Sequence, residues 1–301
     1  MDVPAPDLGA TPSRRSHLPG GRRPRVLVTG AGGRLAHAIL EAFSDGDAVG
    51  LGLADLDIAD DAAVRARVEA ECPDVIVNCA AYNNVDGAED HPVAALEVNA
   101  FAVRGLARAA DAAGAVLVHY SSDFVFDGTA SRPYTEDDEP NPQSVYAASK
   151  LLGEWFALEA RRAFVLRVES LFGAPSDGGR SSLDTIVSGI EAGAEVPIFV
   201  DRTVTPAYVY DVAQATRALV GTGAATGLYH CVNSGACSWQ DVALEIARLL
   251  GRDARLRPIT LTGQALRAAR PVYSALDTPR LRAAGIAMPT WQDALARYLR
   301  R

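Results

Sequence analysis

The 301-residue sequence has few cysteines, no long apolar run and no excess of positive charge. Its four cysteines, Cys72, Cys79, Cys231 and Cys237, have spacings that fit no zinc template. We therefore expect free thiols in the reducing cytoplasm and no bound metal. No apolar stretch is long enough to span a bilayer. A net charge of −8 argues against a surface for nucleic acid or anionic membrane, although a local basic patch stays open.

The N-terminal segment lacks large apolar residues. Residues 1–23 are rich in Pro, Gly, Ser and Arg and have no apolar middle segment of the kind found in signal peptides. We expect a flexible tail there. A transit peptide is the weaker alternative, because the stretch shows no amphipathic periodicity. Of the whole chain, 49% is hydrophobic, which suffices for a large core in one or two domains.

Buried strands and helices alternate along the chain. Runs of apolar, β-branched residues predict strands, and apolar stripes after cap residues predict helices. The expected strands are 25–29, about 48–53, 75–78, 116–120, 164–168 and 228–231. Helices are expected over residues 61–72, 181–192, 210–220 and 242–250, and one more lies within 92–113. One helix is expected to end at 43 and a short one at 285. A further helix should begin near 144, and the last should follow 290–293. Such alternation predicts an α/β fold with a doubly wound parallel sheet of Rossmann type.

The order of the elements also predicts two domains. We expect a dinucleotide-binding domain made of residues 24–170 and about 206–232. A second, smaller α/β domain that binds substrate would then comprise about 171–205 and 233–301. Two sequences typical of a capping box, Ser238 to Asp241 and Thr290 to Asp293, precede its last long helices.

A glycine-rich loop follows the first predicted strand and opens the first helix. Gly30 would make the turn, Gly33 would let a pyrophosphate approach the backbone, and Ala36 is small enough for helix–strand packing. A tight strand-to-helix turn without a ligand is the alternative. The strand–loop–helix context favours dinucleotide binding.

Tyr146 and Lys150 are one helical turn apart and so lie on one face of their helix. A nearby ammonium stabilises phenolate, so we expect Lys150 to lower the pKa of Tyr146. Such a phenol can exchange a proton with an alcohol or carbonyl oxygen. By itself the pair is more often a surface Tyr beside a Lys. Ser122, after the fourth strand, and the small pair Ala80 and Ala81, after the third, would lie at the same edge of the sheet.

Taken together, these motifs resemble the extended short-chain dehydrogenase/reductase superfamily, and within it the dTDP-4-dehydrorhamnose reductase family. The resemblance covers roughly residues 24–300. The matching stretches are 28–33, 55–58, 77–82, 85–86, 88–89, 98–100, 122–128, Tyr134 with Glu136, 146–154 and 270–277. It implies an NAD(P)-dependent oxidoreductase of dTDP-rhamnose biosynthesis, which uses NADPH or NADH to reduce the 4-keto group of a nucleotide-activated 6-deoxyhexose. A non-catalytic NADP-binding protein, like the regulatory beta subunit of methionine adenosyltransferase, is the alternative.

The resemblance also implies roles for individual residues. Tyr146 would be the proton donor to the sugar oxygen, Lys150 would hold the cofactor ribose and tune Tyr146, and Ser122 would bind the reacting oxygen. The implied cofactor-binding residues are Gly30, Gly32, Gly33, Arg34, Leu35, Asp57, Ala80, Ala81, Tyr82, Asn99, Tyr146 and Lys150. The implied substrate-binding residues are Asp123, Val125, Phe126, Ser170 and Arg270.

Departures from the family pattern affect substrate and cofactor choice. Ser170 stands where the family commonly has a Trp, and Glu169 beside it brings negative charge towards an anionic diphosphate. Ala207 replaces the Thr of a usual Pro-Thr pair. We therefore expect that the preferred substrate need not be the rhamnose precursor. Arg270 is equally compatible with a diphosphate contact and with a structural ion pair.

Cofactor choice is not fixed by the residues after the second strand. Gly52 and Leu53 offer neither a carboxylate for a ribose 2′-hydroxyl nor a guanidinium for a 2′-phosphate. Arg34, just past Gly33, could reach a 2′-phosphate. We expect both cofactors to bind, with a modest preference for NADPH. The expected small-molecule partner is a nucleotide sugar. A second copy of the chain, in a homodimer, is an open alternative for a protein partner.

Overall fold

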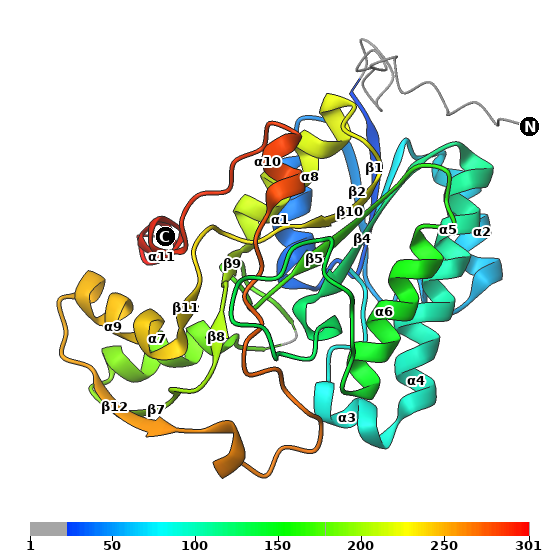
Figure 1. Cartoon of the computed structure of the whole chain (residues 1–301). Coiled ribbons are helices and arrows are strands. Elements are labelled where there is room, and N and C mark those ends of the chain that lie inside the picture. The colour runs from blue at the N-terminus through cyan, green and yellow to red at the C-terminus, as the bar shows by residue number, and fades with distance from the viewer. Residues whose placement is uncertain (1–22, 178, 301) are drawn as a thin grey trace, which may run out of the picture.

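A computed structural model of the chain describes residues 23–177 and 179–300 (Figure 1). The predicted tail therefore lies almost wholly outside the described residues. At the centre is a six-stranded sheet with the order β10-β5-β4-β3-β1-β2, and every neighbouring pair is parallel. Its strands are β1 (Arg25–Thr29), β2 (Asp47–Leu51), β3 (Val75–Asn78), β4 (Val116–Ser122), β5 (Ala163–Val168) and β10 (Gly227–His230). The predicted parallel sheet is confirmed.

Helices cover both faces of this sheet (Figure 1). One face packs against α1 (Arg34–Ala42), α8 (Val209–Thr222) and α10 (Pro279–Ala283). The other packs against α2 (Asp61–Glu71) and α5 (Ala102–Ala113), with α6 (Val145–Ala157) beside α5. Because strand side chains alternate between the two faces, Val26 and Val28 belong to the first core and Leu27 to the second. A sheet buried on both faces explains why its strands read as continuous apolar runs.

Local cap chemistry sets where the helices begin. The Asp60 carboxylate accepts hydrogen bonds from Ala62 N and Ala63 N, at the start of α2. Ser238 and Asp241 form the predicted capping box at the start of α9 (Trp239–Leu250). A second box, with Ser181 at its N-cap, begins α7 (Ser182–Glu191). These helix starts agree with the sequence expectation to within three residues.

The helix expected within 92–113 is interrupted. It consists of α4 (Pro92–Leu96), a π-helical turn η1 (Glu97–Phe101) and α5, and a further short helix α3 (Val85–Asp90) precedes it. Within the π turn, the Asn99 side chain accepts from Tyr82 N at 2.9 Å and donates to Tyr82 O at 3.1 Å. A π turn inserts one extra residue per turn, and here that turn carries the side chain that holds the loop after β3.

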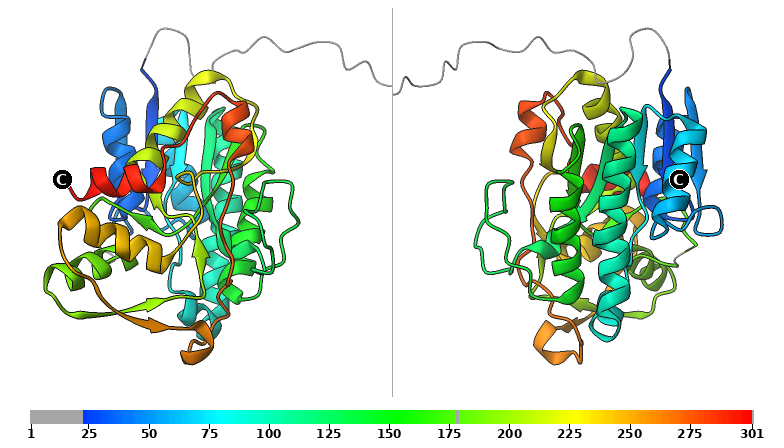
Figure 2. Two further views of the ribbon diagram at one scale, coloured as in Figure 1. Left: turned by 60° about the vertical axis from the view of Figure 1, so that its left-hand side comes forward. Right: turned by 90° about the vertical axis from the view of Figure 1, so that its right-hand side faces the viewer.

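A second region lies at one end of the central sheet (Figure 2). It contains α7, α9 and α11 (Trp291–Tyr298), which share an apolar core with Val196 and Ile198. The region and its junction also hold small paired strands and short 3-10 turns. These are β6 (Leu171–Phe172) with β9 (Ala207–Tyr208), β7 (Glu195–Phe199) with β12 (Arg255–Ile259), β8 (Thr203–Val204) with β11 (Cys237–Ser238), η2 (Asp123–Val125) and η3 (Leu261–Gly263). The exact division of the chain into two domains stays a prediction.

Helix length and polarity bear on membrane insertion. Across residues 23–177 and 179–300, no helix combines the length and the apolar character needed to cross a bilayer.

Candidate active site

A cavity of about 560 Å³ opens at the carboxyl ends of the central strands. β2 and β3 pair with opposite sides of β1, so the direction of chain progression reverses between β1 and β3. Ligands of open α/β sheets bind at such a reversal. The lining joins both regions of the molecule, from the glycine loop and the ends of β3 and β4 to Trp239 and Arg270. This position makes the cavity the candidate active site.

The glycine loop approaches the end of β3 too closely for a side chain. Gly30 has a φ of 68°, and a Cβ at this position would lie 2.7 Å from Ala80 N. α1 begins after Gly33, which has no side chain to cap the first N–H groups of the helix. Uncapped N–H groups at a helix start bind anions such as phosphate. The loop therefore fits the diphosphate of a dinucleotide.

Helix α6 holds Tyr146 and Lys150, and its orientation is fixed at both ends. At its start, Ser144 Oγ accepts from Ala147 N at 3.2 Å. Near its other end, Glu154 accepts two hydrogen bonds from Arg167 on β5, at 2.8 and 2.7 Å. Both side chains of this ion pair are almost fully buried. A buried bidentate pair allows little rotation of the helix, so the facing side chains keep their place.

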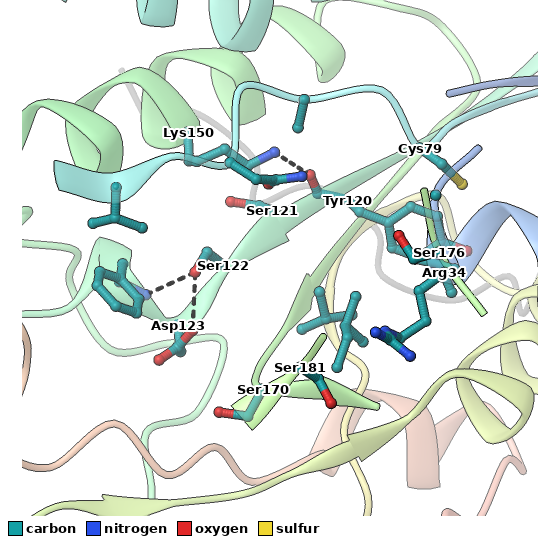
Figure 3. A pocket seen from close by; sticks show the side chains of 18 of the residues that line it. Arg34, Cys79, Tyr120, Ser121, Ser122, Asp123, Lys150, Ser170, Ser176 and Ser181 are labelled. Atoms are coloured by element: carbon teal, nitrogen blue, oxygen red, sulfur yellow. Dashed lines mark hydrogen bonds between the residues drawn. The ribbon is translucent and has the colours of Figure 1, made fainter. Parts of the chain in front are cut away.

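Lys150 is the single lysine of the sequence, and it is buried in the lining of the cavity. Its Nζ donates to the Tyr120 carbonyl at 2.6 Å (Figure 3). Burial lowers the pKa of Lys150 to about 8, while the nearby Glu154 and Cys79 act in the opposite direction. An ammonium has two further N–H donors, which suits a group that holds ribose hydroxyls.

The pKa of the Tyr146 phenol is raised, whereas the sequence analysis expects it to be lowered. Burial raises its pKa, the charge of Asp123 raises it further, and a hydrogen bond with Ser122 lowers it. Lys150, which was expected to lower this pKa, donates to a backbone carbonyl instead. The phenol is therefore protonated near neutral pH, which is the state that a proton donor needs.

Ser122 and Asp123 lie beside the phenol at the end of β4. Ser122 Oγ donates to Asp123 Oδ1 at 2.9 Å and accepts from Phe124 N at 3.2 Å (Figure 3). Burial raises the pKa of Asp123 to about 6. Its second oxygen, Oδ2, is buried and has no hydrogen-bond partner among the described residues. Together with Tyr146, this places two hydroxyl groups and a carboxyl group around one point of the cavity wall.

The cavity brings together most, but not all, of the predicted site residues. Those that line it are Gly33, Arg34, Leu35, Ala80, Ala81, Ser122, Asp123, Tyr146, Lys150, Ser170 and Arg270. Those that lie outside its lining are Gly30, Gly32, Asp57, Tyr82, Asn99, Val125 and Phe126. Val125 and Phe126 are buried in the core, where the Phe126 ring stacks on Tyr134. Asn99 supports the loop after β3, as described above.

Two arginines predicted to contact ligands also make contacts within the protein. Arg34 donates to the carbonyls of Ala174 and Gly179 and pairs with Asp184 on α7 at 2.9 Å. Arg270 pairs with Asp86 at 2.9 Å, as in the alternative of a structural ion pair. Both line the cavity, and their ligand roles stay predictions.

Sequence reasoning missed several lining residues. Trp239, the first residue of α9, and Arg202, after β7, reach the cavity from the second region. Only the capping box next to Trp239 was visible in the sequence. The Ser121 hydroxyl also lines the cavity, and it is buried without a hydrogen-bond partner in the part of the chain that is described. A buried polar atom without a partner usually awaits a ligand or water.

Comparison with known proteins agrees with this geometry. The sequence profile of the family described as "RmlD substrate binding domain" matches residues 24–301. The chain is 41% identical over 285 residues to a dTDP-4-dehydrorhamnose reductase of Streptomyces griseus, covering 91% of this chain and 92% of that protein. It is 38% identical to a probable dTDP-4,6-dihydroxy-2-methyloxan-3-one 4-ketoreductase of Streptomyces antibioticus, covering 90% and 93%.

A solved structure is similar over the same span. The crystal structure of dTDP-4-dehydrorhamnose reductase from Bacillus anthracis, in complex with NADP, superimposes with a TM-score of 0.87 at 32% identity, covering 92% of this chain and 99% of that one. The family profile spans both regions that line the cavity, so the whole described fold is shared. The chain therefore belongs to the RmlD substrate binding domain family of extended short-chain dehydrogenases/reductases.

Proposed function

We propose that the protein is an NAD(P)H-dependent oxidoreductase that reduces the 4-keto group of a nucleotide-activated 6-deoxyhexose, as a dTDP-4-dehydrorhamnose reductase does. The observation that carries this proposal is the meeting of Ser122, a protonated Tyr146 and Lys150 in one cavity with the glycine loop. The names of the relatives support the same reaction. A purely regulatory role would leave this protonated donor without a use.

The residues divide the work of the reaction. A nicotinamide cofactor, when bound beside the glycine loop, would supply the hydride that the sugar carbon receives. Ser122 and Tyr146 orient the carbonyl oxygen, and Tyr146 gives it the proton that completes the alcohol. Lys150 holds ribose hydroxyls, and its positive charge favours the phenolate that remains on Tyr146 after transfer. A donor whose pKa is raised by burial holds its proton until a stronger base, the developing alkoxide, is present.

NADPH is the cofactor that we favour. The relative from Bacillus anthracis was solved with NADP. Arg34 lines the cavity directly after the glycine loop, where its guanidinium could exchange its contact with Asp184 for a 2′-phosphate. Guanidinium groups bind phosphate bidentately. NADH lacks this phosphate, so it would bind more weakly while still filling the rest of the site.

The wall around the sugar supports a substrate that differs from the rhamnose precursor. Ser170 provides no broad apolar face, whereas the indole of Trp239 lines the cavity from the second region. One relative is named as a 4-ketoreductase of a different dTDP-linked sugar. Arg270, at the same cavity, supplies positive charge for a diphosphate.

A cofactor-oxidation assay with a panel of nucleotide-linked 4-keto sugars tests the proposal. We expect NADPH to be oxidised in the presence of at least one dTDP-linked 4-keto-6-deoxy sugar. The loss of NADPH absorbance measures this oxidation. The product should be the corresponding 4-hydroxy sugar by mass. Tight binding of NADPH with no oxidation by any sugar of the panel would instead support the regulatory role.

We also propose that a second copy of the chain is the protein partner and that the cytoplasm is the location. Four large apolar side chains are exposed on or beside the adjoining elements α4, η1 and α6, and α5 and α6 run along an outer face (Figure 2). They are Val93, Phe101, Trp155 and Leu158. Exposed apolar side chains on neighbouring elements mark protein interfaces. Light scattering of wild type and Trp155→Glu would distinguish a dimer from a monomer.

Free thiols fit a reducing compartment, which supports the cytoplasm as the location. A net charge of −8 argues against a nucleic-acid partner.

A further inference from the structure

A segment of the chain after β12 connects the second region back to the sheet. Residues 264–276, called the crossing segment below, follow η3, pass beside α3 and lead towards α10 (Figure 1). The segment carries Arg270 into the cavity lining, and α3 holds Asp86 against it. Because the segment and α3 come from different parts of the chain, their contact decides where Arg270 lies relative to the sheet.

The Asp86 carboxylate makes three hydrogen bonds with the crossing segment. Its Oδ1 accepts from Arg267 N at 3.2 Å and from Ala268 N at 3.0 Å. Its Oδ2 accepts from Arg270 Nη2 at 2.9 Å. The hydrogen bond from Ala268 N is the main cause that holds the pKa of Asp86 below its ordinary value, so the group is ionised at neutral pH. One oxygen therefore holds the backbone of the segment, and the other holds the guanidinium.

The Arg270 guanidinium has further contacts that fix its orientation. Its Nη1 donates to Ala268 O at 2.9 Å, and its central carbon lies 5.9 Å from the centroid of the Phe124 ring. A guanidinium over an aromatic ring is attracted by the face of that ring. The Phe124 ring in turn contacts the Tyr146 ring in a T-shaped arrangement, with centroids 5.7 Å apart. Arg270 is thus held one aromatic ring away from the candidate proton donor.

These contacts leave N–H groups of Arg270 for a ligand. A guanidinium has five N–H donors, and the contacts with Asp86 and Ala268 use one on each terminal nitrogen. The Arg270 side chain is 14% exposed and lines the cavity. An ion pair and a ligand contact therefore do not exclude each other at Arg270. The carboxylate occupies one edge of the guanidinium, and the remaining donors can bind a diphosphate.

A second guanidinium explains why Arg270 needs such an anchor. Arg202 lines the same cavity, and its Nε donates to Pro271 O at 3.2 Å. Burial lowers the pKa of Arg202, and the charge of Arg270 lowers it further, so the two cations repel each other. Without Asp86, this repulsion would favour orientations of Arg270 that turn away from Arg202. Asp86 offsets the repulsion and keeps both positive charges at the cavity, where they suit an anionic ligand.

We propose that Asp86 is a positioning residue for substrate binding, which fixes Arg270 on the Phe124 ring so that the guanidinium meets the diphosphate of a nucleotide sugar. This inference rests on the proposed function, from which the diphosphate follows. Asp86 lies outside the cavity lining and acts through Arg270. Its effect should therefore appear in the affinity for the nucleotide sugar and much less in kcat or in the affinity for NADPH.

The variant Asp86→Asn tests the proposal at one of the two oxygens. The amide oxygen can still accept from Arg267 N and Ala268 N, but the amide nitrogen cannot accept from Arg270. We expect KM for the nucleotide sugar to rise about tenfold, the scale of one charge-assisted hydrogen bond. We expect kcat to change less than about twofold, because a contact made equally in the ground state and the transition state affects KM alone.

Two further variants separate positioning from a general loosening of the crossing segment. Asp90→Asn is the matched control, because Asp90 also lies on α3 and pairs with Arg267, but neither residue lines the cavity. It should keep the wild-type KM. If Asp86 acts through Arg270, adding Asp86→Asn to Arg270→Gln should raise KM no further. A further rise of about tenfold in the double variant would overturn the proposal.

Binding of dTDP in the absence of a sugar substrate keeps the test independent of the proposed reaction. Calorimetric titration of the full chain should give a Kd for dTDP about tenfold higher in Asp86→Asn than in wild type. Unchanged binding in the variant, or no binding by wild type, would overturn the positioning role even if the protein reduces a sugar. Tighter binding would also overturn it, because Asp86 would then compete with the diphosphate for the guanidinium. Weaker binding by the variant of a protein that reduces no sugar would instead reject the proposed reaction and support the positioning role.

Discussion

Burial decides how the ionisable side chains of the cavity carry their protons. It raises the pKa of Tyr146, Asp123 and Glu169 and lowers that of Lys150 to about 8. In each case burial is the largest cause, and neighbouring charges modify it. A reductase needs a protonated donor in its resting state, so the same desolvation that would hinder deprotonation is useful here.

The first prediction at this scale concerns Tyr146→Phe, which removes the hydroxyl and keeps the ring. Turnover should fall about a hundredfold or more, the usual scale of general acid–base catalysis. The affinity for NADPH, measured by fluorescence titration, should change little. Tyr229→Phe, which removes a hydroxyl bonded to Ala225 O outside the cavity lining, is the control. Near-normal turnover in Tyr146→Phe would refute the role of the phenol.

A second residue-scale prediction concerns stability and pH. The pKa of Glu169 in the fold is well above its ordinary value of 4.5. Its favourable contribution is therefore complete below about pH 4.5 and is lost as the pH rises through the folded pKa. Glu169→Gln removes this dependence. The difference in Tm, variant minus wild type, should grow from pH 4.5 to pH 9.

A control distinguishes this effect from a general response to lost charge. Glu245 is a carboxylate whose pKa is lowered, chiefly by its hydrogen bond with Arg248. Glu245→Gln should give a Tm difference that does not grow over the same pH range. A flat difference for Glu169→Gln as well would contradict the raised pKa.

At the scale of elements, the turn between β5 and β6 has an unusual backbone. Ser170 has a φ of 45°, in the left-handed region that favours glycine. The turn brings Ser170 to the cavity while Glu169, just before it, stays buried. The left-handed backbone at Ser170 thus allows Ser170 to line the cavity while the side chain of Glu169 is buried in the protein.

Substitutions at Ser170 test this strain. Ser170→Gly should be at least as stable as wild type, with a gain of about 1 kcal/mol or less, because glycine adopts positive φ without a Cβ clash but loses more chain entropy. Ser170→Val should be destabilised by more than about 1 kcal/mol, since a β-branched residue is a poor fit for this region. Urea unfolding measures both. A Val variant as stable as the Gly variant would contradict the assignment of strain.

The central strands were predictable because each is an apolar run between recognisable turns and caps. The pair β7 and β12 was not. Strand β12 has the sequence Arg255–Ile259 and is mostly exposed, so it lacks the apolar alternation that predicts a strand. It forms by pairing with β7, about 60 residues earlier in the chain. Pairing partners of this kind are a property of the tertiary fold and leave little trace in a local window.

The same distinction applies to the candidate site. Tyr146 and Lys150 share one helix, so their spacing alone places them together. Glu169 owes its position to Ser274, which is 105 residues away, and to Thr205. Nothing in the residues around Glu169 indicates these partners. The sequence therefore predicted that Tyr146 and Lys150 lie together, but not which side chains hold Glu169 in place.

At the scale of the whole molecule, Arg34 connects the two regions that form the cavity. It belongs to the first helix of the dinucleotide-binding fold, and it pairs with Asp184 on α7 of the second region. Asp184 also accepts from Tyr298 on α11. A cofactor that recruits this guanidinium would therefore influence how the second region is held against the sheet.

Arg34→Ala tests this connection. We expect the Kd for NADPH to rise about tenfold more than the Kd for NADH, the scale of one charge-assisted contact. Titration of both cofactors measures the ratio. Arg217→Ala, which removes an exposed pair with Asp45 outside the cavity lining, is the control. An unchanged NADPH/NADH ratio would mean that Arg34 has only a structural role.

The single lysine has a practical consequence for measuring stability. A protease that cleaves only after lysine has one target bond in the chain, after Lys150, in the middle of α6. Lys150 is buried, so cleavage requires the opening of the helix from the core. Digestion should yield two fragments, residues 1–150 and 151–301, at a rate that reports the open population. Saturating NADPH should slow that rate, so one gel band pattern would read out folding and ligand occupancy together, even in a crude extract.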